Sequence, residues 1–385
     1  MGRSLRLLFG GLTAAALFIL LLELALRIGF RAPTGRFAEF AAGKNGLYPE
    51  KCRIQMLWGP LPYTVEVNSL GFRSREIKRA KGAQSFRIAA VGDSITDGVF
   101  VDNDATWEYF LQDVLTSRTQ QAVEVLNCAR AGGSIDKELC ILKNLVLPLR
   151  PDLVILTFVT NDIANVARKS REQLMAMDTA TLRYGSDTPL EQYRSDLTLW
   201  LLTHTAIGEV FCDAYLTLRS PSYRYGKQRL RSGDERYRIA GGDKFEENVT
   251  VFEKRFRRID GIVLEEPFAA PTQTAIDNYL YVLGKFAELC RDNDIRLLFV
   301  YFPAYSQIYR PASPVRINEI LEKRCAELQI HYLDLTPAFR FRKGEVLHLA
   351  PIDFHLNPAG NRVFAQAVAD HLIAKDFLAR RPRKP

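Results

Sequence analysis

The sequence predicts an α/β protein, a three-layer α/β/α sandwich around a central parallel sheet of about five strands. Five short apolar segments support this prediction, and amphipathic helical stretches separate them, as parallel βαβ connections require. A serine flanked by small residues follows the first segment, at the carboxyl end where open α/β sheets place their ligands. The predicted strands are residues 88–91, 123–127, 153–158, 295–302 and 331–334.

The first strand runs directly into a Gly-Asp-Ser-Ile-Thr-Asp-Gly segment at residues 92–98. Its glycines permit a tight turn, which leaves Ser94 at the end of a buried strand. A helix over 107–115 is predicted next, with Asp104 or Thr106 as its cap. A serine in this position needs a general base and an oxyanion site to become a nucleophile, so we expect both elsewhere in the chain.

The strongest candidate for the base lies near the C-terminus. Of the five histidines, only His355 has a carboxylate two residues before it, Asp353, and an Asn-Pro turn directly behind it. A carboxylate beside an imidazole fixes its tautomer and stabilises the imidazolium that forms when serine loses its proton. Ser94, Asp353 and His355 are therefore the predicted catalytic residues, and a final helix over 359–374 follows them.

Two other residues compete for these roles. His348 is the nearest competing histidine, but leucines flank it, so we predict that it is structural. Asp334 ends the last predicted strand and is the second candidate for the triad carboxylate.

Four blocks of the sequence resemble the SGNH/GDSL hydrolase family, in the family's order. They are Gly-Asp-Ser-x-Thr-x-Gly at 92–98, Val-Leu-Asn-Cys-Ala-Arg-Ala-Gly at 125–132, Val-Thr-Asn-Asp at 159–162, and the closing Asp-x-His. The resemblance covers roughly residues 85 to 165 and 270 to 375. Two positions depart from the family pattern. Val159 stands where glycine is usual, and the last block has one residue between its Asp and His where two are commonest.

The resemblance also implies which groups donate hydrogen bonds to the oxyanion and whether a cofactor is needed. The donors would be the backbone of Ser94, the backbone of Gly132 and the side chain of Asn161. We expect Asp93 and Asp162 to brace their loops through hydrogen bonds to backbone rather than to take part in the chemistry. The family fold is of the SGNH/flavodoxin type, and no metal or cofactor is expected.

The implied function is ester hydrolysis through an acyl-enzyme on Ser94, with an acyl ester of a carbohydrate or lipid as substrate. Two alternatives remain open. The acyl group could pass to a sugar hydroxyl, which would make the protein an O-acyltransferase or transesterase of an exported glycan. The chain could also be a catalytically inert, membrane-tethered binding or assembly component, although such a protein has no need for the three triad residues.

The N-terminus predicts a membrane anchor. Residues 7–22 contain only Gly, Thr, Ala, Phe, Ile and Leu, and the apolar stretch continues to residue 30 around Glu23 and Arg27. These two residues stand four apart and can pair on a helix. The segment approaches the roughly 20 residues that a bilayer requires. A cleaved signal peptide is the alternative, and either origin predicts a periplasmic or otherwise extracytoplasmic body.

The chain divides into four predicted parts. Residues 1–31 are the anchor, 32–84 a connector with some β structure around residues 63–67, 85–377 the hydrolase domain, and 378–385 a basic tail. A long, mostly helical insertion at about 164–270 interrupts the hydrolase domain. It is either a lid or substrate surface, or a covering of the core.

The charge and cysteine content narrow the possible partners. The net charge is +8 and the sequence pI is near 9.1, which suits anionic headgroups or an acidic polymer, or only a solvated basic face. No nucleic-acid motif accompanies the charge, so no nucleic-acid partner is expected. The six cysteines show no metal-binding spacing.

Overall fold

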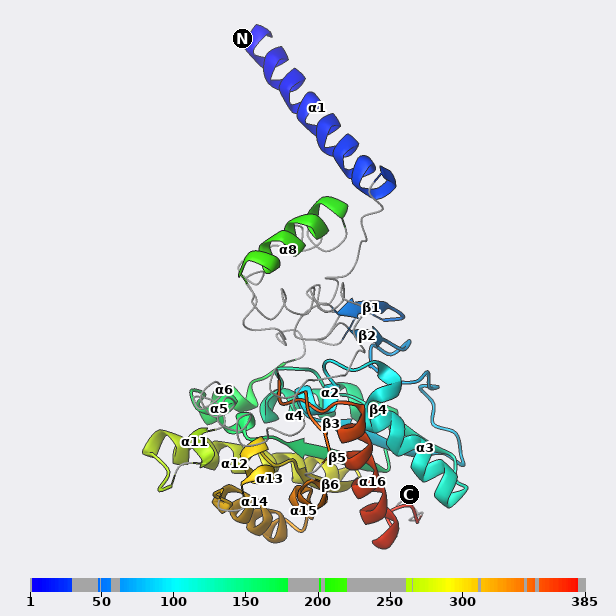
Figure 1. The fold of residues 1–385 in the computed structure, drawn as a ribbon, viewed down its shortest axis with the longest axis vertical. Coiled ribbons are helices and arrows are strands. Elements are labelled where there is room, and N and C mark those ends of the chain that lie inside the picture. Colours follow the sequence, from blue (N-terminus) through cyan, green and yellow to red (C-terminus); the bar gives the residue numbers. More distant parts are fainter. Residues whose placement is uncertain are drawn as a thin grey trace.

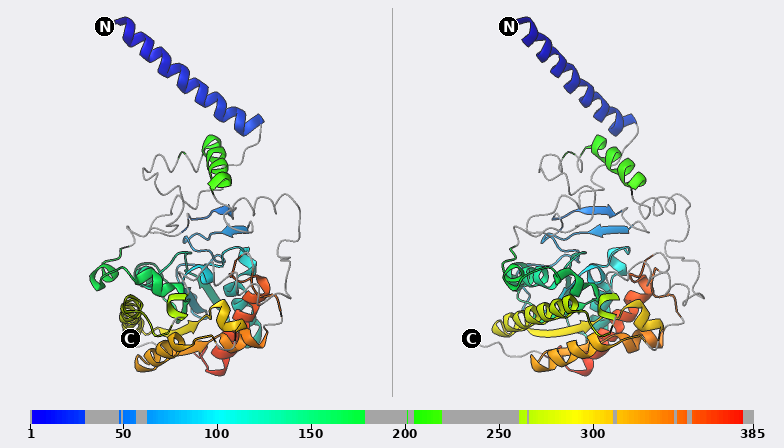
Figure 2. Two further views of the ribbon diagram at one scale, coloured as in Figure 1. Left: turned by 60° about the vertical axis from the view of Figure 1, so that its left-hand side comes forward. Right: turned by 90° about the vertical axis from the view of Figure 1, so that its left-hand side faces the viewer.

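The computed structural model describes residues 2–29, 48, 50–56, 63–178, 201, 205–219, 261–264, 266–310, 313–342, 345–349 and 353–379. These residues form an α/β body, a two-stranded ribbon beside it and a long N-terminal helix that extends away from both (Figure 1). The C-terminal helix lies in the body, at the end of the molecule far from the N-terminus (Figures 1 and 2).

A parallel sheet of five strands forms the centre of the body, in the order β4-β3-β5-β6-β7. This confirms the predicted fold class. The chain runs outward from β3 to β4 and then crosses back to β5, so the end of β3 lies where the strand order reverses. The strands are β3 (Phe86–Val91), β4 (Val123–Asn127), β5 (Leu153–Phe158), β6 (Arg296–Tyr301) and β7 (His331–Asp334).

Helices cover both faces of the sheet because the side chains of β3 alternate between two apolar cores. Ile88 and Ala90 pack into one core with α3, α13, α15 and α16. Ala89 and Val91 pack into the other with α4, α5, α12 and α14. These helices are α3 (Trp107–Thr119), α4 (Ile135–Ile141), α5 (Asn161–Val166), α12 (Ala270–Asp292), α13 (Tyr305–Tyr309), α14 (Arg316–Glu327), α15 (Thr336–Phe341) and α16 (Pro358–Ala374).

Three predicted strands agree with the structure residue for residue, and the other two differ only at their ends. Of the two predicted caps of α3, Thr106 is confirmed in position and Asp104 is wrong. Thr106 stands at the N-cap position, but its hydroxyl donates to the carbonyl of Asn103 at 3.0 Å and makes no cap hydrogen bond. Asp104 lies in a 3₁₀ turn, Asn103–Ala105, before the helix. The hydroxyl of Thr106 therefore bonds to the carbonyl of a turn residue and does not bond to a backbone N–H of the helix.

Two short irregular helical segments follow α4. A π-helical segment, Leu142–Val146, and a 3₁₀ turn, Leu147–Leu149, carry the chain from α4 to the start of β5. Leu142 and Leu149 are buried in this passage, so it closes one face of the sheet beside α12.

The N-terminal helix consists of α1 (Gly2–Leu24) and a π-helical turn, Ala25–Gly29. The stretch Phe9–Gly29 is 21 residues long, is apolar enough to cross a membrane, and is not buried against the rest of the protein. A membrane anchor and a signal sequence both fit these properties. Arg27 Nε donates to Glu23 Oε1 at 2.6 Å, so the two charges inside this stretch pair as expected.

The connector contributes an antiparallel ribbon of β1 (Arg53–Met56) and β2 (Tyr63–Glu66), and β2 ends one residue earlier than predicted. Tyr63 and Val65 are buried in a third apolar cluster that includes Phe100 and Leu349 from the body. The ribbon therefore lies over the edge of the sheet at which α2 (Ser94–Asp97) begins (Figures 1 and 2).

The described parts of the predicted insertion are mostly helical. They include α6 (Arg171–Met175), α8 (Ala206–Arg219) and α11 (Gly261–Leu264). Helix α8 lies between the body and the N-terminal helix (Figure 1). The arginine- and tyrosine-rich run at 223–231 and the basic residues from 380 onward lie outside the described residues.

Candidate active site

A tight turn holds Ser94 at the carboxyl end of β3. The chain passes through Gly92 and Asp93 into α2, so Ser94 is the first residue of a short helix, Ser94–Asp97. Glycine is needed at position 92 because a Cβ there would lie 2.5 Å from the hydroxyl of Thr96. The Asp93 side chain caps the helix and accepts a backbone N–H of its first turn at 3.1 Å. The serine is consequently fixed at its backbone while its side chain is only partly buried.

Ser94, His355 and Asp353 form one hydrogen-bonded row, which joins residues 261 positions apart. His355 Nε2 lies 2.8 Å from Ser94 Oγ, and His355 Nδ1 contacts Asp353 Oδ1. Because an ionised carboxylate only accepts, Nδ1 carries the imidazole proton, and Nε2 accepts a hydrogen bond from the serine hydroxyl. A base that accepts from serine while a carboxylate orients it has the geometry required for nucleophile activation.

The short Asp-x-His spacing is accommodated by a local turn. The backbone N–H of His355 also donates to Asp353 Oδ1, at 3.0 Å, so the carboxylate folds back on the residue two positions ahead. Its Oδ1 thereby meets both the backbone and the ring of one histidine. One intervening residue is enough for this contact.

Two further contacts hold the histidine segment in place. Leu349 N donates to the carbonyl of His355 at 3.0 Å, beside an antiparallel bridge between His348 and Leu356. Asn357 then caps α16 through a hydrogen bond from Gly360 N at 2.9 Å. His355, the predicted base, is thus fixed between a bridge and a helix N-terminus.

Two aromatic rings flank the imidazole of His355. Phe354 stacks on it with 4.7 Å between ring centroids, and Phe100 meets it edge-on at 5.3 Å. Phe100 belongs to the cluster under the β1–β2 ribbon, so the connector packs against the same ring that contacts the base. These contacts restrict the rotation of the imidazole.

The predicted oxyanion donors converge on the same edge of the sheet. Within the described part of the chain, no hydrogen bond uses the backbone N–H of Ser94 or of Gly132. Gly132 has φ +75°, and a Cβ there would meet no heavy atom within 4 Å, so its turn borders open space. The Asn161 amide donates to Asp93 Oδ2 at 3.0 Å, which orients one of its two N–H bonds and leaves the second for another acceptor.

Val159, which replaces the usual glycine of the third block, fits its position without strain. It is buried and does not have a positive φ. Its backbone N–H donates to Asp162 Oδ2 at 3.0 Å, so the loop that carries Asn161 is closed by its own carboxyl group. Positive φ, which would favour glycine, is not needed here.

Three buried carboxyl groups lie beneath the serine turn: Asp93, Glu138 and Asp162. Burial raises the pKa of all three, and the neighbouring carboxyl groups raise the pKa of Glu138 and Asp162 further. Both oxygens of Glu138 and one of Asp162 lack a hydrogen-bond partner in the described residues. Burial and mutual repulsion therefore favour the neutral forms of Glu138 and Asp162, while Asp93 accepts hydrogen bonds from Ile95 N and from the amide of Asn161.

The two competing residues lie apart from the row. His348 is buried among aromatic rings, and burial lowers its pKa to about 3, so it is neutral and cannot exchange protons near neutral pH. Asp334 accepts from Asn318 Nδ2 at 2.9 Å and from Thr336 N at 2.8 Å, which gives it a turn-stabilising role.

Sequence reasoning missed Asp97, which belongs to the serine segment itself. Its Oδ2 accepts from Ala131 N at 2.8 Å, directly before Gly132, and its carboxylate also accepts from the hydroxyl of Tyr48. Asp97 thus joins the serine turn to the loop that carries Gly132, which we call the oxyanion loop after its predicted role. The signal was present, since the Thr-Asp-Gly end of the first block places an acid beside the nucleophile.

Arg73 was also missed. This buried residue of the connector donates through Nη1 to the carbonyls of Asp97 and Gly98, at 2.6 and 2.7 Å. Gly98 has φ +75° and ends α2. The guanidinium therefore satisfies carbonyls at the end of a short helix, where no further helical turn can do so. Nothing in the local sequence of the connector pointed to this partner.

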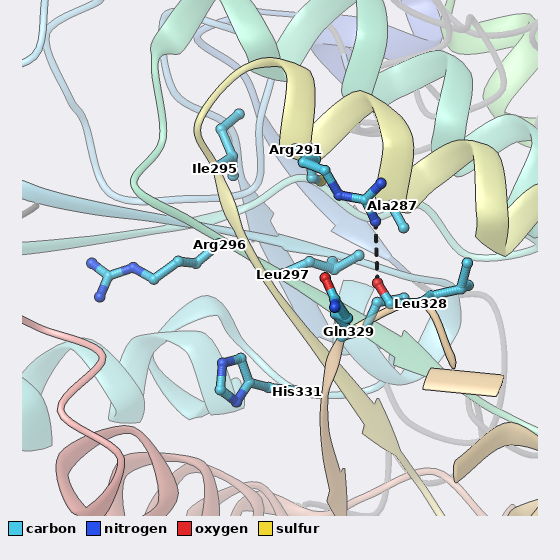
Figure 3. Close-up of a pocket in the computed structure, with 10 residues that line it drawn as sticks. Ala287, Arg291, Ile295, Arg296, Leu297, Leu328, Gln329 and His331 are labelled. Atoms are coloured by element: carbon cyan, nitrogen blue, oxygen red, sulfur yellow. Dashed lines mark hydrogen bonds between the residues drawn. The ribbon is translucent and has the colours of Figure 1, made fainter. Parts of the chain in front are cut away.

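A cavity of about 200 Å³ lies at the opposite edge of the sheet, where β6 and β7 begin. Figure 3 shows Arg296 and His331, the first residues of these strands, together with Arg291 from the end of α12. Arg291 Nη2 donates to the carbonyl of Leu328 at 3.2 Å. The cavity is at the amino ends of the strands, so it is separate from the Ser94 row.

The cysteines are all free thiols. Five are buried and Cys52 is half-buried, and burial raises the pKa of Cys290 and Cys325 to about 12. Raised pKa values keep thiols protonated and unreactive. In the described parts of the chain, no group of three or more histidine, cysteine or acidic side chains is arranged to hold a metal ion.

Residues 90–195 match the model of the GDSL-like Lipase/Acylhydrolase family. The matched region begins in β3 and includes Ser94, Gly132 and Asn161. The resemblance that the sequence blocks indicated is thereby confirmed. No curated protein sequence matches this chain significantly.

Several solved structures share low similarity with the chain. LAE5, described as an alpha/beta hydrolase enzyme from the metagenome of Lake Arreo, Spain, is 13% identical with a TM-score of 0.41, over 78% of this chain and 98% of its own. The acetylxylan esterase Axe2 from Geobacillus stearothermophilus is 12% identical with a TM-score of 0.39, over 80% of this chain and 100% of its own. CEX, a two-domain esterase active on acetylated mannans, is 12% identical with a TM-score of 0.39, over 78% of this chain and 52% of its own.

Proposed function

We propose that the chain is an enzyme that acts on ester bonds through an acyl-enzyme on Ser94, a proposal that the match of residues 90–195 to the GDSL-like Lipase/Acylhydrolase family supports. One observation carries this proposal: His355 Nε2 lies 2.8 Å from Ser94 Oγ while its Nδ1 contacts Asp353. An isolated serine hydroxyl is a weak nucleophile at neutral pH. The oriented imidazole supplies the base that the hydroxyl lacks.

The first half of the reaction transfers the acyl group to the enzyme. His355 takes the proton of Ser94 as Oγ bonds to the ester carbonyl carbon, and Asp353 stabilises the imidazolium that results. The protonated His355 then gives this proton to the leaving alkoxide, which departs as the alcohol. Ser94 is left as an acyl ester.

The second half restores the enzyme. His355 takes a proton from water, the hydroxide bonds to the acyl carbon, and Ser94 leaves with the proton that His355 returns. Both tetrahedral intermediates carry a negative oxygen. In this proposal, that oxygen accepts hydrogen bonds from the backbone of Ser94 and Gly132 and from the second N–H of Asn161.

We assign the substrate to acyl esters of carbohydrates or lipids. The acylhydrolase chemistry of the matched family supports an acyl ester, and the open space beside Gly132 supports access by a bulky alcohol group. Water is the acceptor in this proposal.

The N-terminal helix serves in the same proposal as a retained membrane anchor. Glu23 accepts hydrogen bonds from Ala206 N at 2.9 Å and from Ile207 N at 3.0 Å. Loss of the segment by cleavage would remove the acceptor of two helix N–H groups, so the contact supports retention. The basic residues followed by an apolar run resemble an export signal, which supports an extracytoplasmic body.

The test is the pre-steady-state release of p-nitrophenol from p-nitrophenyl acetate by the full chain in detergent. We expect a burst equal to the enzyme concentration, followed by a slower steady state. Ser94→Ala and His355→Ala should abolish the burst. Ser117→Ala, which changes an exposed serine on α3, should leave it intact.

Three outcomes decide between the candidate functions. A burst lost in both triad variants, with acetate as the product, supports hydrolysis through Ser94. Acetyl transfer to added glycan acceptors in preference to water would replace the hydrolase proposal with a transferase. Identical slow rates in all four proteins would contradict the acyl-enzyme and favour an inert tethered component.

A further inference from the structure

Helix α8 presents its apolar side outward. Val210, Phe211 and Leu218 are 46, 45 and 76% exposed, and Ala214 is also exposed. With the partly exposed Ile207, these residues recur at the spacing of three, four and seven that places them on one face of a helix. The exposed face of α8 is therefore apolar along its whole length.

The opposite side of α8 is buried, although it carries an acid. Glu209 and Cys212 have no exposed surface, while the apolar residues of the other face reach outward. A surface helix of a water-soluble protein has the reverse arrangement, with apolar residues inward and charges outward. The inverted helix suits a setting in which the outer face does not meet water.

The start of α8 is bound to the N-terminal helix. Glu23 accepts from the first two backbone N–H groups of α8, at 2.9 and 3.0 Å, and Arg27 pairs with the same carboxylate. A carboxylate at this place satisfies orphan N–H groups and complements the helix dipole. The contact holds the N-terminus of α8 beside Glu23, the first acidic residue after the apolar residues 7–22 of α1.

The apolar face of α8 begins beside the apolar residues at the end of the N-terminal helix, because Glu23 holds the first turn of α8. Leu22, Leu24 and Ile28 around the Glu23 contact are exposed, as is the face of α8 beside them. Both elements lie on the side of the body that carries α2 and the β1–β2 ribbon (Figures 1 and 2). One surface could cover both apolar faces at once, namely the bilayer that the N-terminal helix enters.

We infer that α8 is an interfacial membrane helix, whose face of Ile207, Val210, Phe211, Ala214 and Leu218 lies on the lipid bilayer that α1 spans. The inference rests on the proposed membrane anchor. Interfacial helices bury their apolar face about 5–10 Å into the boundary of headgroups and acyl chains. With α1 and α8 as two contacts, the body is held with the carboxyl edge of its sheet toward the membrane. An ester at the membrane surface would then reach Ser94 more readily than one in bulk solution.

The test uses the full chain in vesicles of phosphatidylcholine and phosphatidylglycerol, with an environment-sensitive fluorophore on single introduced cysteines. Cys52→Ser removes the one half-buried native thiol. Leu218→Cys reports on α8, Leu17→Cys on the anchor, and Ser117→Cys on the exposed surface of α3. Bromine-labelled lipids quench only fluorophores that touch the acyl chains. Phe211→Glu in the Leu218→Cys protein tests the same face without labelling a new position.

We expect quenching at 218 several-fold above that at 117, and a fall toward the level at 117 once Phe211→Glu is added. Quenching at 17 with none at 218 would overturn the inference and leave the anchor intact. Quenching at 218 without quenching at 17 would reject the anchor on which the inference rests and would overturn it. A signal at 218 that ignores bromolipids but rises with protein-to-lipid ratio would identify a second copy of the chain and overturn the inference. None of these readings depends on ester hydrolysis, so failure of the esterase proposal is seen separately in the burst.

Discussion

The hydroxyl of Tyr48 donates to both carboxylate oxygens of Asp97, at 3.0 and 2.9 Å. Tyr48 belongs to the connector, and Asp97 belongs to the serine segment. Because Asp97 also accepts from Ala131 N, one carboxylate joins the connector, the nucleophile turn and the oxyanion loop. The guanidinium of Arg130 stacks on the Tyr48 ring at 3.5 Å and adds a second contact between connector and loop.

Tyr48→Phe tests whether this junction positions the oxyanion loop. A hydrogen bond to a charged group is worth about 1.5–3 kcal/mol, so we expect kcat for p-nitrophenyl acetate to fall about tenfold or more. KM should change little, since in the proposed mechanism the loop contacts the developing oxyanion rather than the ground-state ester. Tyr281→Phe, which changes a tyrosine on α12 away from the site, is the matched control. An equal fall in both variants, or a change in KM alone, would reject the positioning role.

Asp353→Asn tests the assignment of the triad carboxylate. Asparagine can donate to Nδ1 and so favour the wrong tautomer, and the corresponding change in a serine protease triad lowers kcat about 10⁴-fold. We expect a loss of at least about 10³-fold here. Asp334→Asn removes the competing carboxylate, which contacts Asn318 and Thr336, and should leave kcat within about twofold. The reverse order of effects would move the role to Asp334.

Asn161→Ala tests the side-chain oxyanion donor. Loss of one such donor costs about 2.7–4 kcal/mol, or 10²–10³ in kcat. The burst amplitude should persist, because Ser94 and His355 are unchanged, while its rate falls. Asn293→Ala alters an exposed amide at the end of α12, which donates to the carbonyl of Leu289 at 2.8 Å, and serves as control. A variant at 161 that keeps the wild-type burst rate would show that its amide only orients Asp93.

His348 makes stability depend on pH. Burial depresses its folded-state pKa from 6.5 to about 3, so the unfolded chain binds a proton that the folded chain does not. The contribution is present above pH 6.5 and is lost as the pH falls toward 3. The loss is about 2 kcal/mol at about pH 5. Urea unfolding at about pH 7.5 and about pH 5 should show this loss in the wild type and a smaller one in His348→Phe. Parallel pH dependences in the two proteins would contradict it.

The local elements of the α/β body were predictable because their signals lie in adjacent residues. Strands β4, β5 and β7 read as short apolar runs between turns, and the body follows from their alternation with helical stretches. The position of the α3 cap at Thr106 was predictable, but the partner of its hydroxyl was not, because the carbonyl of Asn103 in the preceding turn competes with the helix N–H groups.

The serine turn and the Asp-x-His pair were predictable for a different reason. Each is a short local pattern, and a serine nucleophile needs a general base. Ser94 therefore pointed to His355, the histidine with a neighbouring carboxylate. Asp97 could be noticed as an acid beside Ser94, but its partners in the connector and in the loop of Gly132 could not be predicted. Arg73 was not predictable at all, because it lies in the connector and its partners lie in the serine turn. The inverted face of α8 is also invisible in sequence, since an apolar stripe alone does not say which side of a helix is buried.

By itself, the sequence determined the parallel α/β body, the glycine-bounded serine and the acid–histidine pair, because periodicity, turn chemistry and residue type act within a few positions. Only the tertiary structure decided that Ser94 and His355 meet at 2.8 Å across 261 positions, that Asp97 couples the connector to the oxyanion loop, and that α8 exposes its apolar side beside Glu23. These relationships depend on how the chain packs around the sheet, where contacts between distant segments select one partner among several that the sequence allows.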